Sequence, residues 1–493
     1  MYNFPSAVTP SRSESVIVTI VLLVFLLLGF VVASRLPINN GTMVDEIMFI
    51  DPATNLYFGN GFTSSAWFAQ AKNEFWAGYP PLYSLILFLW MQIFGFSIAT
   101  AKSLNYVLII VAGLLLWLSV IRLNLVNSTR SRVTLIAIFL ANLEDSFNYR
   151  TGRPDSLTIV LSLAALLAYS IQSTWLRCLL LACISIFIPL TGLQLAAYAV
   201  ILPCILLAYL RTSFLRESVS IAIGLAIGTV SLYILYSTNG VWQGFIKSIR
   251  ENNSVKRTSL FSSLHGWKAA GFFKDDAFKL LLLVLLSIII YKLVKAKFRL
   301  HSQLSFGLVV SFCIPFGMMF LSAYPRYYNW MAFIPLAICV CSEVSISSRG
   351  TPKGWLSLLI IGCLLAVSLS GYFRGLAVLA VNWKALDYSP IEALVEKNVT
   401  RSDWVVSDSV AYYAAKTRAA TVIYANSGAS YLNIIPSQEK EHISALIIEP
   451  EKFENVVNTL GGKWYDSGRG LSLKSKRGRS LVDLKIYRRD LAS

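Results

Sequence analysis

The residues best suited to chemistry near the start of the chain are two adjacent carboxylates, Asp45 and Glu46. They follow the apolar run 15–34 by about ten residues. A paired acid next to a membrane can act as a general base or hold a divalent cation. Acidic residues are also typical of the first turn of a helix, where they complement the positive end of the helix dipole. The dipeptide alone leaves both interpretations open.

A second group lies in the segment YRTGRPDS (149–156), a tight turn between two apolar runs that contains Arg150, Arg153 and Asp155. Guanidinium groups suit phosphate recognition because their planar fork matches two phosphate oxygens. The proline fixes the turn, and Asp155 could also cap the following helix. The segment is therefore either part of a phosphate site or a structural turn.

A third group lies in AKNEFWAGYPPLY (71–83), where Lys72 and Glu74 precede two prolines. Lys72 is a further candidate to bind a phosphate. The aromatic side chains of this segment could stack on a sugar or form an interfacial belt. These aromatic residues are Trp76, Tyr79 and Tyr83.

Cations gather in two further places. The loop 239–276 carries six Lys and Arg against three acids, and a phosphate ligand would explain that excess. It contains Lys268 and His265, and a single His in such a loop is typical of a structural residue. Arg326, in AYPRYY, lies where the chain enters a late apolar run, so its guanidinium is expected at head-group depth. Arg326 would bind either a substrate phosphate or ordinary lipid.

The composition predicts a polytopic membrane protein. Of 493 residues, 56% are hydrophobic and 14% are charged, and the mean hydropathy is +0.61. The seven cysteines all lie in apolar segments without a CxxC pair, which argues against disulfides and a thiolate metal site. The net charge of +17 is typical of cytoplasmic loops that face anionic lipid, and no basic helix or stacking platform indicates nucleic acid.

The apolar runs predict about eleven membrane spans. They are 15–34, 103–121, 133–146, 157–173, 176–190, 192–210, 218–236, 278–291, 303–323, 327–342 and 355–373. The stretch 80–97 is short for a span. If it lies along the interface, the cytoplasmic short connectors carry twelve Lys and Arg and those on the other side carry three. The positive-inside rule therefore favours an interfacial 80–97.

This topology predicts a transmembrane domain, 1–380, with outer loops 35–102, 147–156 and 237–277. Residues 381–493 are expected to form a small α/β domain on the same, extracytoplasmic side of the plasma (inner) membrane, because strand and helix patterns alternate there. No ionisable residue falls in the middle of a predicted span, whereas ion-coupled transporters place such residues there. The ionisable groups gather instead at one membrane face.

Four motifs in order resemble the GT-C glycosyltransferases, most closely the protein O-mannosyltransferase and aminoarabinose-transferase branch. They are VDEIMFIDPATNLYFGNG, GYPPLYSLILFLWMQIFG, RPDSLTIVLSLAALLAY and YPRYYNWMAFIPLA, over about 330 residues. The resemblance implies an inverting transfer of a sugar from a polyprenyl-phosphate donor to an acceptor on the extracytoplasmic face. Such an enzyme needs no nucleophile of its own, because the lipid phosphate is the leaving group.

The resemblance also implies roles for single residues. Asp45 matches the essential first-loop acid that activates the acceptor, with Glu46 as its partner. Asp155 matches the acid of the second outer loop, and Arg326 matches the RY motif before a late span. Relatives place Glu-Lys directly before the prolines, whereas here Lys72 and Glu74 are separated by one residue and FWAG intervenes. Glu74 and His265 are therefore only candidate ligands for a divalent cation.

Two other functions stay open at this stage. A lipid or polysaccharide transporter would keep exporting substrate after loss of Asp45, without transfer chemistry. A sensor would bind ligand through 381–493 alone. The absence of ionisable residues from the middle of the predicted spans argues against a transporter. The first-loop motif argues against a sensor.

Overall fold

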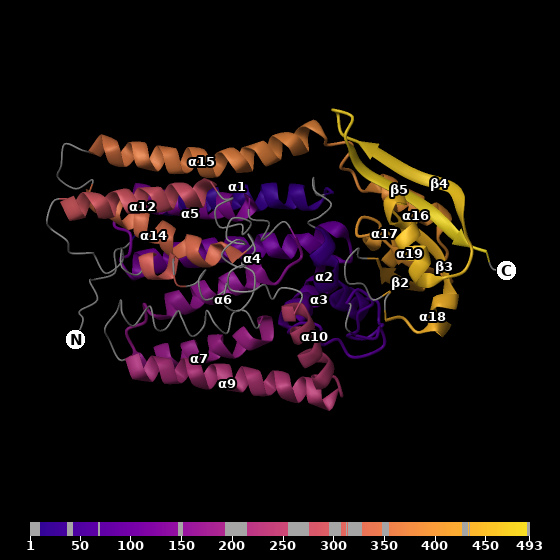
Figure 1. The fold of residues 1–493 in the computed structure, drawn as a ribbon. Coiled ribbons are helices and arrows are strands. Elements are labelled where there is room, and N and C mark those ends of the chain that lie inside the picture. The colour runs from indigo at the N-terminus through magenta and orange to yellow at the C-terminus, as the bar shows by residue number, and fades with distance from the viewer. Residues whose placement is uncertain are drawn as a thin grey trace.

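The computed structural model describes residues 10–36, 43–67, 70–145, 151–192, 214–254, 276–294, 307–311, 313, 328–347, 354–425, 432 and 434–490. A bundle of roughly parallel and antiparallel helices forms one part of the molecule. A five-stranded sheet with short helices lies at one end of that bundle (Figure 1). We call this end of the bundle the sheet-facing end.

Among the described residues, five helices are long and apolar enough to cross a membrane. They are, or lie within, α1 (Arg12–Ala33), α4 (Ile98–Arg122), α7 (Thr174–Thr191), α9 (Phe214–Thr238) and α15 (Gly354–Val381). Large apolar side chains are exposed along α1, α9 and α15, as expected for helix faces that meet lipid. The chain is thus built as an integral membrane protein.

The remaining bundle helices are α5 (Thr129–Asp145), α6 (Asp155–Ala168), α12 (Asp276–Val294) and α14 (Trp330–Ser347). All the predicted spans except 192–210 and 303–323 coincide with a helix of the bundle. Those two lie wholly or largely outside the described residues, so the count of about eleven spans stays a prediction.

Three shorter helices lie at the sheet-facing end: α2 (Met43–Tyr57), α3 (Leu82–Phe94) and α10 (Trp242–Ser254) (Figure 1). Helix α3 follows Pro81 and ends at Gly95, whose φ of 77° suits glycine. Its 13 residues span about 20 Å, which is short of the roughly 30 Å hydrocarbon core of a bilayer. The length of α3 is therefore consistent with the interfacial interpretation of 80–97.

The sheet has the strand order β2-β1-β3-β5-β4. Its strands are β1 (Trp404–Ser407), β2 (Thr421–Tyr424), β3 (Ile443–Ile448), β4 (Trp464–Lys474) and β5 (Ser480–Arg489). Strands β2, β1 and β3 are parallel, whereas β5 pairs antiparallel with β3 and β4. The helices around it are α16 (Ser389–Asn398), α17 (Tyr412–Arg418), α18 (Ser437–His442) and α19 (Phe453–Leu460), with the 3-10 turn η5 (Pro450–Lys452).

The strand–helix–strand pattern of 404–425 and the last strand are present as the sequence predicts. Strand β4 was not predicted, because most of its side chains are exposed and show no alternation.

One hydrophobic core contains residues of α2, α3, α16, α17 and the sheet together. The predicted boundary at residue 380 is therefore not a break in packing.

Candidate active site

Helix α2 presents its two adjacent carboxylates in different directions. The Asp45 side chain is 51% exposed, whereas Glu46 is fully buried. Successive residues of a helix point about 100° apart, so one face of α2 can meet solvent while the next meets protein. The pair therefore divides into an accessible acid and an interior acid.

Asp45 belongs to a chain of three charged groups. Nη1 of Arg153 contacts Oδ2 of Asp45, and Nε of Arg153 donates to Oδ2 of Asp155 at 3.0 Å. Arg153 also lies 5.5 Å from the centre of the Phe49 ring. The guanidinium thus joins the first predicted acid to the second and fixes the orientation of both.

The turn that carries Arg153 is held by tight packing. Asn105 of α4 donates through Nδ2 to the carbonyl oxygens of Thr151 and Arg153, the latter at 3.0 Å. A Cβ on Gly152 would lie 2.2 Å from a side-chain carbon of Ile50 and 3.3 Å from Cγ of Glu46. Only glycine allows this approach of the turn to α2, so Gly152 sets the distance between Arg153 and Asp45.

Glu46 joins α2 to α17. Its Oε1 accepts a hydrogen bond from the Tyr413 hydroxyl, whereas its Oε2 is buried without a hydrogen-bond partner in the described part of the chain. Burial raises the pKa of Glu46, and the charge of the buried Lys102 and the Tyr413 hydroxyl oppose that shift. Burial and the Glu46 carboxylate also raise the pKa of Tyr413 well above its usual value. Glu46 therefore lies in an interior polar cluster.

Asp51, one and a half turns further along α2, makes a second link to α17. Its carboxylate accepts from the Ser65 amide at 2.7 Å and from the Ser64 hydroxyl at 2.9 Å. It also contacts the Tyr412 hydroxyl and pairs with Lys416 at 2.8 Å. The region after α15 is thereby fixed to the helix that carries Asp45.

The three predicted sugar-stacking residues are buried or partly buried in the protein. Trp76 is fully buried between the rings of Phe62 and Trp67. Tyr83 is buried, and the partly buried Tyr79 lies edge-on to Phe49 with ring centres 5.0 Å apart. Of the three, Tyr79 is linked to Arg153 through Phe49, which contacts both side chains.

Lys72 contacts residues of the C-terminal region. Nζ of Lys72 is 3.3 Å from Oε2 of Glu439 and 3.5 Å from the centre of the Trp404 ring. Burial lowers the pKa of Lys72, and Glu439 opposes the shift. Glu74 is exposed.

Four other predicted site residues lie outside the described residues: Arg150, His265, Lys268 and Arg326. Within the described ranges, no group of three His, Cys, Asp or Glu could hold a metal ion.

Sequence reasoning missed four members of this cluster: Asp51, Lys102, Tyr412 and Tyr413. A single charge at the start of an apolar helix was the available signal for Lys102, in SIATAKSLNYVL. Tyr412 and Tyr413 were predicted to lie in a helix, but a local pattern does not show which residues that helix contacts. Their partners follow from how α17 packs on α2.

The fold is similar to that of two solved structures of ArnT from Cupriavidus metallidurans. The form bound to undecaprenyl phosphate has a TM-score of 0.63 at 10% identity, over 98% of this chain and 99% of that chain. The apo form has a TM-score of 0.61 at 12% identity, over 97% and 98%. ArnT is an aminoarabinose transferase of the GT-C superfamily.

More distant similarity links the chain to larger proteins. The apo oligosaccharyltransferase from Archaeoglobus fulgidus has a TM-score of 0.52 at 11% identity, over 97% of this chain and 75% of that chain. The arabinofuranosyltransferase AftD from Mycobacteria has 0.51 at 13%, over 99% and 40%. No family profile and no curated protein sequence matches the chain. The chain thus shares its fold with solved GT-C membrane glycosyltransferases, the class that the four sequence motifs resemble.

Proposed function

We propose that this protein is a glycosyltransferase that moves a sugar from a polyprenyl-phosphate donor to an acceptor at the extracytoplasmic face of the plasma membrane. The accessible Asp45 carboxylate carries the proposal. It lies at one end of an apolar helix bundle and is oriented by Arg153, within a fold shared with an undecaprenyl-phosphate-bound transferase. A head group at the membrane surface and a lipid tail between helices suit that position.

In this proposal Asp45 is the general base. An acceptor hydroxyl oxygen attacks the anomeric carbon of the donor, and the bond from that carbon to the phosphate oxygen breaks. The hydroxyl proton passes to Asp45, and the lipid phosphate leaves with the bonding electrons. One displacement of this kind inverts the anomeric carbon. Arg153 holds the base in place, and Asp155 holds Arg153.

The departing phosphate needs cations. Arg153 contacts two carboxylates, so its role in this proposal is to orient Asp45. Arg326 is the strongest candidate for the phosphate contact, with Arg150 and Lys268 as further candidates from the predicted outer loops. A fixed guanidinium stabilises the charge that develops on the leaving oxygen. A divalent cation held by Glu74 and His265 would add to this stabilisation.

The experiment is an assay of donor turnover. The purified protein in lipid nanodiscs is incubated with radiolabelled polyprenyl-phosphate sugars and a membrane-glycan extract as acceptor. We expect release of free polyprenyl phosphate together with transfer of label to the acceptor, and both should be lost in Asp45→Asn. The same protein is also reconstituted in sealed vesicles. Movement of the intact donor across that bilayer without release of lipid phosphate would contradict the proposal and favour the transporter.

A further inference from the structure

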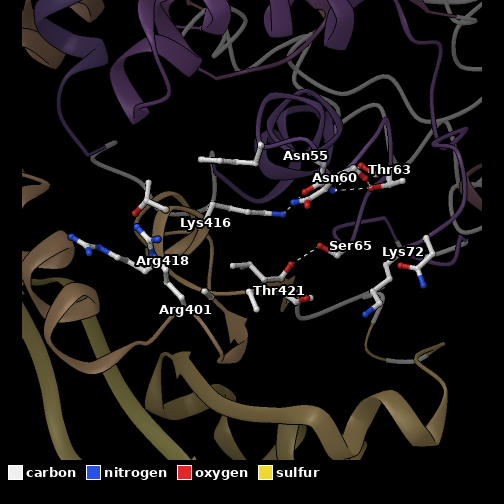
Figure 2. A pocket seen from close by; sticks show the side chains of 15 residues that line it. Asn55, Asn60, Thr63, Ser65, Lys72, Arg401, Lys416, Arg418 and Thr421 are labelled. Carbon is white, nitrogen blue, oxygen red and sulfur yellow. Dashed lines mark hydrogen bonds between the residues drawn. The ribbon is translucent and has the colours of Figure 1, made fainter.

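A polar cavity of about 760 Å³ lies where the first loop region meets α17 and β2. Figure 2 shows Asn55, Asn60 and Thr63 along one side, opposite Arg401, Arg418 and Thr421. Among the described residues that line it are four cations, Lys72, Arg401, Lys416 and Arg418, and no acid. The size is that of a small-molecule site.

The cavity is built on fixed contacts. Lys416 donates to Oδ1 of Asn55 at 2.7 Å and pairs with the buried Asp51. The Ser65 hydroxyl donates to the Val422 carbonyl oxygen at 2.5 Å, and the Tyr424 amide donates to the Ser65 carbonyl at 3.3 Å. These bonds join segments more than 350 residues apart in sequence. They therefore fix the two walls of the cavity relative to each other.

The charges of the cavity are only partly matched. Lys416 is paired with Asp51, Lys72 with Glu439, and Arg418 with Glu396. Arg401 is exposed and, among the residues that the structure describes, has no ion-pair partner. Asn73 is likewise exposed on the opposite, first-loop wall. One positive charge is therefore left for a ligand, with neutral amide and hydroxyl groups around it.

We propose that this cavity binds an anionic saccharide, a sugar that carries a phosphate or a carboxylate. Arg401 receives the anion, because its fork matches two oxygens. Asn60, Asn73 and Thr421 offer hydrogen bonds to sugar hydroxyl groups. Apolar side chains are few in the lining, with Phe58 the one aromatic ring, so lipid tails and stacked bases fit poorly.

The site is separate from the Asp45 carboxylate. Asn55 lies ten residues beyond Asp45 on the same helix, which is about 15 Å along its axis. In the proposed transferase the cavity would hold a part of the acceptor remote from the reacting hydroxyl. That assignment rests on the proposed function, whereas binding of an anionic sugar does not.

The test measures binding by calorimetry to the full-length protein in phosphatidylcholine nanodiscs. Glucose 6-phosphate is the probe, and glucose and inorganic phosphate are the reference ligands. We expect glucose 6-phosphate to bind more tightly than either reference. Arg401→Gln should weaken that binding by about threefold to tenfold, since a single partly exposed charged contact is lost. Arg477→Gln, an exposed substitution in the β4–β5 turn, should leave binding unchanged.

Three outcomes would overturn the proposal: equal binding to wild type and Arg401→Gln, equal binding of glucose or inorganic phosphate, and loss of glucose 6-phosphate binding in phosphatidylglycerol nanodiscs. The last would identify a lipid head group as the occupant. Asp45→Asn separates the two proposals, because it should abolish turnover and retain glucose 6-phosphate binding. Binding without turnover in the wild-type protein would contradict the transferase alone.

Discussion

Lys416 of α17 and Asp51 of α2 form a buried ion pair, with Nζ and Oδ1 2.8 Å apart. The side chains are 7% and 0% exposed. The same lysine donates to Asn55, and Tyr412 contacts the same carboxylate. The region after α15 is thus fixed to the helix of Asp45 by buried polar contacts as well as by a shared hydrophobic core.

Loss of one member of this pair should destabilise the protein strongly. Asp51→Asn leaves the Lys416 ammonium buried without a counter-charge, a change that typically costs about 3–5 kcal/mol. We expect a marked fall in the apparent Tm of the purified protein. Asp51→Asn combined with Lys416→Met should recover part of that fall, because the buried charge is then removed. Asp466→Asn, in an exposed pair with Lys485, is the control and should change little. Equal behaviour of Asp51→Asn and Asp466→Asn would show that the pair does not hold this interface.

Local sequence pattern was sufficient for most elements and insufficient for their contacts. The apolar runs and the alternation in 404–425 predicted helices and strands, because burial imposes a period on the side chains. The same patterns do not show that Glu46 faces inward to Tyr413 while Asp45 faces outward. That division depends on how α17 and the 151–154 turn pack on α2. Gly152 permits the approach, but a glycine in a short polar segment is typical of any turn, so its position in the sequence does not indicate this contact.

Stability should depend on pH through Glu46. Because burial raises its folded-state pKa above the usual value of 4.5, the folded protein holds the proton more tightly than the unfolded chain. The contribution of Glu46 is therefore fully present below about pH 4.5 and is lost as pH rises through the raised pKa. Glu46→Gln keeps a hydrogen-bond acceptor for Tyr413. Because Gln does not titrate, the variant should not show the fall in stability that ionisation of Glu46 causes as pH rises. Apparent Tm, measured from pH 4 to 8, should fall less steeply in Glu46→Gln than in wild type. Parallel curves would exclude Glu46 as the source.

The predicted topology places the connector 122–132 inside and the C-terminal region outside. In a variant without native cysteines, Arg130→Cys and Arg477→Cys introduce thiols at exposed positions. An impermeant thiol reagent added to intact cells should label Arg477→Cys and spare Arg130→Cys until the membrane is opened. Labelling of both from outside would mean that a span has been miscounted.

Asp45→Asn should abolish sugar transfer without loss of folding. The amide keeps the volume of the side chain and can still contact Arg153, but it does not accept the acceptor proton. A positioned general base is typically worth about 10²–10⁴-fold in rate. Donor-dependent release of polyprenyl phosphate measures the effect, and apparent Tm checks the fold. Wild-type turnover by a well-folded Asp45→Asn would remove Asp45 from the catalytic role.

Arg326 distinguishes phosphate recognition from simple membrane anchoring. Anchoring requires only positive charge, which a lysine also supplies, whereas a leaving phosphate held by two parallel hydrogen bonds requires the planar guanidinium fork. We therefore expect Arg326→Lys to lower turnover on the polyprenyl donor well beyond any change in apparent Tm, and Arg326→Ala to lower it further. Arg477→Lys, an exposed change of the same chemistry in the β4–β5 turn, is the matched control. If Arg326→Lys equals wild type in both turnover and Tm, Arg326 is an anchor. The leaving phosphate would then have to contact Arg150 or Lys268. In that case Arg150→Lys is the next variant expected to lower turnover on the polyprenyl donor.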